Sequence, residues 1–343
     1  MYSNDYRGGR LASHANRKRV MAVVTVVLAV VMLIALWASP RAEAAEGGAS
    51  NYVPGMYGDI AVATPPDPGF YLLNFNYFYQ AKESRTILQG RANVDLNIHS
   101  YANITVPFYA FATPVLGARF SIGGFVPLAY GSLEGSLVTP QGSRSFSTDT
   151  HGAAVGDIGL IPAFFNWTLG EHVFVNAYET IILPTGQYDV NNTVNIGRNY
   201  YSFDTVLSLT WFNKNTGTEL SVVPGFMVNT KNTDTDYRTG NEFHMDYMAN
   251  QFLHETFSVG FHGYYYQQVA SDQVSSNTQA LIASFGKTTS DFKASSTGIG
   301  PAVSWIPKFG RDRLLISAKW LHDVEAENRL KADYEFVTIT VKF

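Results

Sequence analysis

Hydrophobic and polar residues alternate with a period of two along most of the chain beyond residue 68. In the last ten residues, "YEFVTITVKF", the pattern is clear from Val337 onward, because one face there carries only apolar residues and the other only Thr and Lys. The apolar positions are Val337, Ile339, Val341 and Phe343. This period predicts a β-strand with one apolar side. A soluble edge strand would have to hide that side, so the rest of the chain must account for it.

The same alternation recurs in about twelve segments, each of strand length. The sequence between them is richer in Gly, Pro, Asn, Asp and Ser, which is typical of turns and loops. The predicted strands cover residues 69–80, 94–106, 116–130, 152–167, 172–183, 201–212, 218–229, 242–252, 257–269, 292–305, 312–322 and 333–343.

The phase of the alternation differs in clarity between segments. Phe203 and Phe261 lie on apolar faces that are expected to point outward. Between residues 152 and 183 the phase is ambiguous, because Glu179 would share a face with two valines. The stretch "LIASFG", within 275–297, fits either a short strand or a loop.

Short and long connections alternate along the predicted strands. The short ones include "LGE", "NKNTG" and "LHE". The longer, polar ones are 131–151, 184–200, 230–241, 270–291 and 323–332, with 81–93 of intermediate length. Short turns at one end, long loops at the other and an even strand number are typical of outer-membrane barrels. We therefore predict an all-β, transmembrane outer-membrane β-barrel of about 12 antiparallel strands, apolar outside and polar inside.

Closure of a barrel also explains the last strand. In a barrel this strand pairs with the first one, so no edge remains and its apolar face can point into lipid. A terminal aromatic residue on such a strand, Phe343 with Ile339 and Val341 before it, resembles the signal that directs bacterial outer-membrane barrels to the barrel assembly machinery. The alternative is a soluble β-protein that happens to end in Phe.

The N-terminus has the features of a secretory signal peptide. "RKR" at Arg17–Arg19 precedes an apolar run from Val20 to Ala38, and Ala42-Glu43-Ala44 is an A-x-A-like cleavage site. We expect residues 1–45 to be removed by cleavage near Ala44 or Ala45. The alternative is an uncleaved anchor helix, since the apolar run is long enough to span a bilayer. The basic leader is long, so the true translation start is expected downstream of Met1.

Composition narrows the function classes. Only 15% of residues are charged, below the roughly 25% usual for soluble domains. The chain has no Cys, which excludes disulfides and Cys-based metal sites. The first 44 residues hold six Lys or Arg and two acids, so cleavage leaves 18 basic and 26 acidic residues, a net charge of −8. A chain of this charge is a poor candidate for binding nucleic acid.

Residues 46–68 do not follow the strand pattern, because Gly, Pro and small residues dominate them. We predict that this segment enters the barrel of residues 69–343 from the periplasmic side and plugs the lumen. Its apolar character favours the plug over the alternative, a disordered periplasmic tail. The residues expected in the plug are Tyr52, Pro54, Met56 and Tyr57.

Inward-facing side chains define the candidate site. If Phe261 points to lipid, its neighbours in the alternation point inward, and so does one face of the preceding strand. The predicted lumen residues are Asp95, Arg119, Asp204, Glu219, Glu242, His244, Asp246, His262, Tyr264, Tyr266 and Lys319. They form either a polar and aromatic wall that guides a small solute or a paired charge network that rigidifies a narrow barrel.

Metal sites fit the pattern less well. His244, Asp246 and His262 are suitable ligand types, but facing strands produce such clusters by chance. Asp234 and Asp236 resemble half of a calcium loop that lacks its Gly and final Glu. We expect a solvated loop there, and neither a metal nor another cofactor in the protein.

Several sequence segments, in the same order along the chain, resemble those of a known family. They include "VGDIGLIPAFFNWTLGEHVF", "LPTGQYDVNNTVNIGRNYYSFDT", "TWFNKNTGTELS", "GFMVNTKNTDTDYRTGNEFHMDY" and "GPAVSWIPKFGRDRLLISAKW". From residue 51 to Phe343 the chain resembles the outer-membrane transporter family named for the meta-pathway (MetA-pathway) of phenol degradation. The resemblance implies uptake of aromatic compounds, and it supplies no catalytic residues that could be assigned to this sequence.

Passive, porin-like uptake of small hydrophobic or aromatic compounds, phenol-like, across the lipid bilayer of the outer membrane is therefore the expected function. A structural or adhesive barrel is the first alternative, although its loops should then be longer and richer in aromatics. A lipid hydrolase is the second, but the chain has no G-x-S-x-G and His262 has no evident Ser partner, so we expect no enzyme. A barrel of twelve strands is narrow, which favours a gated path over a wide pore.

Overall fold

The computed structural model describes residues 50–87, 92–139, 142–150, 152–284, 286, 288–309 and 312–343. The predicted signal peptide, residues 1–45, lies outside the described residues. Within the described part, no helix is both long and apolar enough to cross a bilayer.

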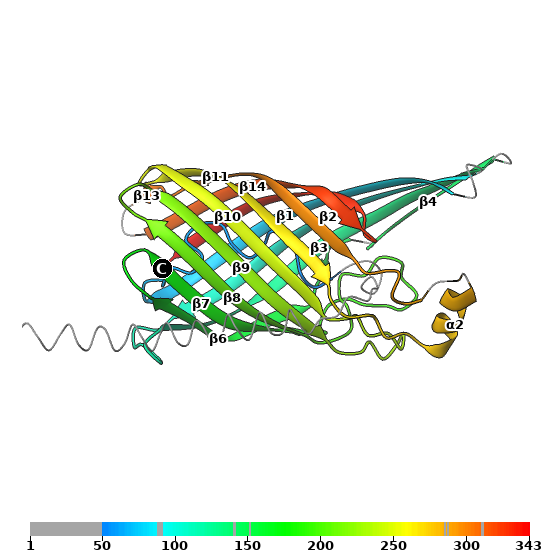
Figure 1. The fold of residues 1–343 in the computed structure, drawn as a ribbon, viewed down its shortest axis with the longest axis horizontal. Coiled ribbons are helices and arrows are strands. Elements are labelled where there is room, and N and C mark those ends of the chain that lie inside the picture. Colours follow the sequence, from blue (N-terminus) through cyan, green and yellow to red (C-terminus); the bar gives the residue numbers. More distant parts are fainter. Residues whose placement is uncertain are drawn as a thin grey trace, which may run out of the picture.

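Twelve antiparallel strands form a closed barrel (Figure 1). Each pairs with the next along the chain, and β15 returns to pair with β1, for example at Tyr77 opposite Phe336. The prediction of a closed barrel is thus confirmed, and the last strand has no free edge. The strands are β1 Gly69–Ile87, β2 Ala92–Ala110, β3 Arg119–Thr139, β6 Ile158–Thr168, β7 Val173–Leu183, β8 Ser202–Asn213, β9 Thr218–Asn229, β10 Glu242–His254, β11 Phe257–Gln268, β12 Ser295–Trp305, β14 Asp312–Glu327 and β15 Lys331–Lys342.

Three shorter strands pair at the margins of the barrel. The strand β4, Gly142–Asp149, continues the pairing of β3 beyond the wall, and β5, Ala154–Val155, fills the gap between β4 and β6 along β3. The third, β13, Lys308–Phe309, pairs with β14 at the short-turn end. The chain terminus lies at that same end, where the Phe343 amide donates to the carbonyl of Phe70 at 2.9 Å.

Some predicted loops are wrong. The segments 81–93 and 131–151 were expected to be loops, but β1, β2, β3 and β4 continue through most of them and project past the barrel (Figure 1). Strand pairing needs only backbone partners, so polar sequence forms strands once it leaves the lipid. The expected long loop 323–332 is a tight turn between β14 and β15. The stretch 275–297, for which the sequence allowed a short strand or a loop, contains a helix, α2, Ser276–Ser284.

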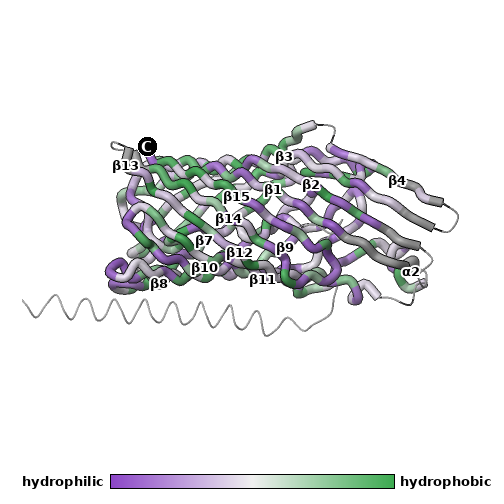
Figure 2. Tube along the Cα trace, turned by 90° about the horizontal axis from the view of Figure 1, so that it is seen from above, coloured by the Kyte–Doolittle hydropathy of each residue, from purple (hydrophilic) through white to green (hydrophobic). Residues whose placement is uncertain are grey.

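The outer face of most of the wall is apolar, as expected. Phe203 on β8, Phe261 on β11 and Ile339 on β15 are exposed, while the residues beside them, such as Asp204 and His262, are buried. Figure 2 shows hydrophobic and hydrophilic residues alternating along the strands. On β7 the ambiguous Glu179 lies on the outer side, where its carboxylate accepts a 2.6 Å hydrogen bond from Thr205.

The polarity is reversed over β1 and β2. Leu73, Phe75 and Tyr77 point into the barrel, whereas Asn74 and Asn76 between them point outward. The general expectation of a polar interior and an apolar exterior is wrong in this sector. Its apolar residues line the lumen, and its amides form a hydrogen-bonded group on the outer wall.

Candidate functional site

The N-terminal segment, residues 50–66, lies inside the barrel against the polar part of its wall. Tyr52 is 2% exposed and Ala63 is fully buried, although neither belongs to a strand. The Asn166 and Asn176 amides, on β6 and β7, donate to the carbonyls of Ala63 at 3.2 Å and Val62 at 3.0 Å. Side chains that the sequence predicts to face the lumen form most of the remaining contacts.

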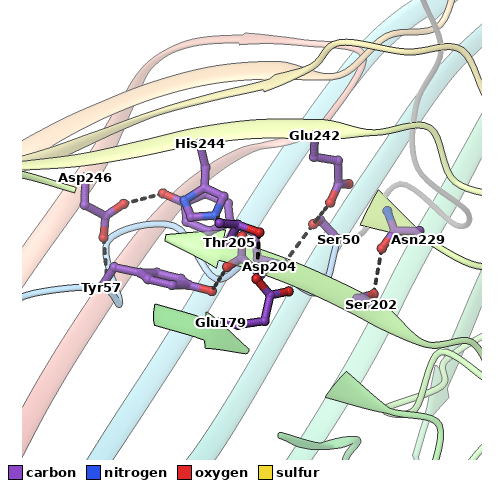
Figure 3. Close-up of polar contacts among 11 residues, drawn as sticks. Ser50, Tyr57, Glu179, Ser202, Asp204, Thr205, Asn229, Glu242, His244 and Asp246 are labelled. Carbon is purple, nitrogen blue, oxygen red and sulfur yellow. Dashed lines mark hydrogen bonds and ion pairs between the residues drawn. The ribbon is translucent and has the colours of Figure 1, made fainter. Parts of the chain in front are cut away.

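Asp246 and Asp204 form the centre of this contact (Figure 3). The Asp246 carboxylate, on β10, accepts hydrogen bonds from the Tyr52 hydroxyl and, at 2.8 Å, from the Tyr57 amide. The Asp204 carboxylate, on β8, accepts the Tyr57 hydroxyl at 2.6 Å and contacts His244 Nε2 at 2.9 Å. The ring of Tyr52 stacks on His244, with centroids 4.2 Å apart. Five side chains and one backbone amide thus form a buried network shared by wall and segment.

Glu242 binds the start of the segment. Its carboxylate accepts Ser50 Oγ at 2.8 Å from the segment and the Tyr266 hydroxyl at 2.8 Å from β11. The neighbouring Asn51 amide donates to Ser202 Oγ at 2.7 Å. This end of the segment is therefore held by two neutral donors, one bound to a carboxylate and the other to a serine hydroxyl.

Lys319 and Glu219 bind the middle of the segment. Lys319 Nζ, on β14, donates to the carbonyl of Gly58 at 2.6 Å and forms an ion pair with Asp59 at 3.0 Å. Glu219, on β9, accepts the Ala61 amide at 2.7 Å. The Asn250 amide bridges the two groups, because it donates to the Asp59 carbonyl at 3.1 Å and to Glu219 at 3.2 Å.

Two predicted lumen residues lie elsewhere. Asp95 is exposed and accepts a 3.1 Å hydrogen bond from Ser136 where β2 and β3 project past the barrel. Its neighbour Leu96 faces the cavity, so strand alternation turns Asp95 away from it. Arg119 begins β3 at the short-turn end and donates to the carbonyls of Phe111 and Ala112 at 2.9 and 2.8 Å. Period-two alternation is correct only for side chains within the wall, and these two lie at its limits.

The remaining predicted residues are brought together on one side of the lumen. His262 Nε2 contacts the Asn250 side chain at 2.9 Å, and the Tyr264 hydroxyl contacts Asp323. In the described part of the chain, no group of three or more His, Asp or Glu side chains is arranged to hold a metal ion. In the calcium-like loop, Asp236 pairs with Lys231 and Asp234 accepts the Asn199 amide.

A cavity of about 1330 Å³ separates the segment from the opposite wall. The segment forms one side of the cavity with Pro54, Met56 and Tyr57. The inner faces of β1, β2 and β3 form the other side, and they are almost entirely apolar. The cavity-facing residues of these strands include Tyr71, Leu73, Phe75, Tyr77, Tyr79, Leu96, Ile98, Ile104, Val106, Phe108 and Phe125.

Strand alternation in the sequence predicts the polar part of the wall, but the apolar part is not predicted. The signal was present, because "GFYLLNFNYFYQ" alternates as clearly as any strand of the chain. Alternation divides a strand into two faces, and the expectation of a polar interior assigned them wrongly here.

The long loop 184–200 covers the cavity at the end opposite the short turns. Tyr188, Ile196 and Arg198 in this loop line the cavity. Asp157, just before β6, anchors the loop by accepting the amides of Gly186 at 2.8 Å and Arg198 at 2.7 Å. Burial raises the pKa of the Asp157 carboxyl, while these amides act in the opposite direction. The loop is thus fastened at both ends by one carboxylate.

Three solved structures show similarity to this chain. The COG4313 outer membrane channel from Pseudomonas putida F1 aligns with a TM-score of 0.59 and 15% identity, covering 85% of this chain and 100% of that one. At this identity the likeness establishes the barrel fold alone. A Pseudomonas aeruginosa FadL homologue (TM-score 0.39, 8% identity, 89% and 98% covered) and the transport unit of the autotransporter AIDA-I from Escherichia coli (0.37, 9%, 84% and 93%) are more distant.

A search of curated proteins finds no match to the sequence. Residues 76–337 match the family described as "Putative MetA-pathway of phenol degradation". The match runs from the middle of β1 into β15 and confirms the family resemblance of the sequence segments quoted above. Together with the closed barrel it places the protein in the bacterial outer membrane. The chain therefore belongs to the family named for the MetA-pathway of phenol degradation.

Proposed function

We propose that the protein is a gated channel for passive uptake of small hydrophobic or aromatic molecules, and that residues 46–68 form its plug. The observation that carries the proposal is the cavity of about 1330 Å³, which has an apolar wall on one side and the N-terminal segment on the other. A channel for ions or sugars would need polar groups facing the free space, whereas here most of them face the segment.

The apolar wall supplies a continuous path along the barrel axis. Tyr79, Leu73 and Phe108 line the cavity at successive positions from the loop end towards the short-turn end. Burial of one apolar side chain or ring of similar size contributes about 1.5–3 kcal/mol. A binding free energy of this size holds an aromatic solute only weakly. Because similar apolar contacts follow along the wall, the solute can pass from one contact to the next.

The segment supplies the gate. It crosses the lumen and binds the wall mainly through hydrogen bonds and one ion pair, all of which water could replace if the segment moved. Departure of the plug would also uncover the apolar cluster that Tyr52 shares with Leu321 and Phe336, which favours the closed state at rest. Opening would leave the apolar wall free along its whole length.

Uptake and conductance test the two parts of the proposal. Cells with and without the gene should differ in uptake of radiolabelled aromatic compounds, and they should not differ for sugars of the same size. Deletion of residues 46–68 should raise the conductance of the purified protein in planar bilayers. Equal uptake of every compound in both strains would overturn the channel, and unchanged conductance after the deletion would overturn the plug.

The absence of Cys from the sequence allows a direct measurement of plug position. Ala63 is fully buried between the segment and the wall. In an Ala63→Cys variant, a membrane-impermeant thiol reagent should react slowly with the closed channel and faster when the segment leaves. Asn215→Cys, in the exposed turn between β8 and β9, serves as the control for reagent access.

A further inference from the structure

An arginine lies over an aromatic ring at the loop end of the cavity. Arg329 belongs to the tight turn between β14 and β15, and it lines the cavity together with Tyr77 and Tyr79 of β1. Its guanidinium carbon is 4.8 Å from the centroid of the Tyr266 ring. This distance is that of a cation–π contact, which holds one face of the guanidinium and leaves its edges free.

Asp323 acts electrostatically on this arginine, but its carboxylate, like that of Glu242, is occupied by other hydrogen-bond donors. Asp323 accepts hydrogen bonds from the hydroxyls of Tyr264 and Tyr334 and from the Ala332 amide. Glu242 accepts Ser50 and Tyr266. Within the described residues, the Arg329 guanidinium forms neither an ion pair nor a hydrogen bond, so its five N–H donors have no protein acceptor. A half-buried charge in this state is costly unless a ligand or water supplies the acceptor.

Two tyrosine phenol groups beside this arginine also have unused hydrogen-bonding capacity. Tyr77 and Tyr79 both line the cavity, and both interact electrostatically with Arg329. Their hydroxyls form no hydrogen bond to any residue in the described ranges. Their rings contact Tyr334 at centroid distances of 6.4 and 5.4 Å, so the phenols are held in place while their oxygens stay free.

The loop end of the cavity therefore differs from the part below it. Three side chains there offer unused donors, whereas the next cavity-facing residues of β1, Phe75 and Leu73, are purely apolar. A molecule that fits both parts has an anionic head and an apolar or aromatic body. A carboxylate fits this head position, because its two oxygens match the fork of a guanidinium in a bidentate pair.

We propose that the cavity binds aromatic carboxylates, with the carboxylate on Arg329 and the hydroxyls of Tyr77 and Tyr79, and the ring on the apolar wall of β1 and β2. This assignment rests on the proposed channel function and names its preferred substrate class. A neutral aromatic alcohol would fill the apolar part and leave the guanidinium unpaired, so it should bind more weakly. Arg198 also lines the cavity, but its backbone amide is bound to Asp157 at 2.7 Å, whereas Arg329 adjoins the phenols of Tyr77 and Tyr79, so we assign the carboxylate to Arg329.

Binding of benzoate and benzyl alcohol to the purified full-length protein in detergent tests the proposal. The wild type should bind benzoate at least tenfold more tightly than benzyl alcohol. Arg329→Gln should remove this difference by weakening benzoate binding about tenfold, with benzyl alcohol changed less than twofold. Arg329→Lys should retain part of the preference. Lys331→Gln, two residues away on an exposed side chain, removes the same charge outside the cavity and should change neither affinity.

Several outcomes separate this assignment from the channel proposal. Equal binding of both compounds, or a benzoate affinity unaltered by Arg329→Gln, would overturn the carboxylate site and leave the channel intact. Equal losses in Arg329→Gln and Lys331→Gln would show a general charge effect and would also overturn the site. A wild-type protein that binds neither compound and does not admit them into liposomes would overturn both proposals. The shift between folded and heat-unfolded bands in gels checks that each variant forms the barrel.

Discussion

Lys319 Nζ on β14 lies 3.0 Å from the Asp59 carboxylate in the N-terminal segment, and the two side chains are 2% and 11% exposed. This ion pair joins wall and segment in the middle of the barrel, close to the 2.6 Å hydrogen bond from Lys319 to the Gly58 carbonyl. A buried pair is a poor source of stability, but removal of one partner leaves an uncompensated charge. The pair therefore adds little net stability to the closed state but makes the loss of either partner costly, which suits a plug that must also leave.

Replacement of Lys319 by Met should open the channel. The variant leaves the Asp59 carboxylate buried without its cation, a loss of about 3–5 kcal/mol for the seated segment. Single-channel recordings in planar bilayers should show a much larger open fraction than in the wild type. Adding Asp59→Asn to Lys319→Met should restore part of the closed state. A closed fraction equal to that of wild type in Lys319→Met would show that this pair does not hold the plug.

Loss of the Tyr52 hydroxyl should loosen the segment less. Tyr52→Phe keeps the stacking on His244 but removes a donor to the buried Asp246, which costs about 1–3 kcal/mol. The Ala63→Cys thiol should then react roughly tenfold faster with an impermeant reagent. Tyr201→Phe, on the exposed outer face, is the matched control and should leave the rate unchanged. Identical rates in both variants would contradict the role of Tyr52.

A bulky side chain on the apolar wall should block transport while the plug stays seated. Ala102 on β2 lines the cavity and is 8% exposed, so Ala102→Trp fills part of the solute path. We expect uptake of labelled aromatics to fall several-fold, with thiol reactivity at position 63 unchanged. Ala249→Trp places the same ring on the lipid-facing side of β10 and should have no effect on uptake. Normal uptake in Ala102→Trp would place the path elsewhere.

The outer amides of β1 and β2 should stabilise the barrel. Asn103 accepts the Asn74 amide at 3.0 Å and donates to Asn74 and Asn76 at 3.0 Å, on the wall side that faces away from the cavity. Asn103→Ala removes these three hydrogen bonds, while Asn74 and Asn76 keep partners in Thr105 and Tyr101, so we expect a loss of about 0.5–1.5 kcal/mol for each bond removed. Urea unfolding in lipid vesicles should detect it. Gln80→Ala, exposed on the same side of β1, should cost little by comparison.

The sequence alone determined the strands, their approximate number and the closed barrel, because alternation with a period of two is a local property of the chain. The strands β8 to β11 match their predicted ranges within two residues. The inward positions of Asp204, Glu242 and His262 were equally predictable, since the apolar side of each of these strands faces lipid.

Only the tertiary structure decided which face of β1 and β2 points inward. Alternation separates Phe75 from Asn74 without stating which one meets lipid, and both arrangements satisfy the backbone equally. The choice depends on register with β15 and on the seated segment, which occupies the polar half of the lumen and leaves the cavity to the apolar half. The pairing of Asp59 with Lys319, 260 positions apart in the chain, likewise arises only when the barrel closes around the segment.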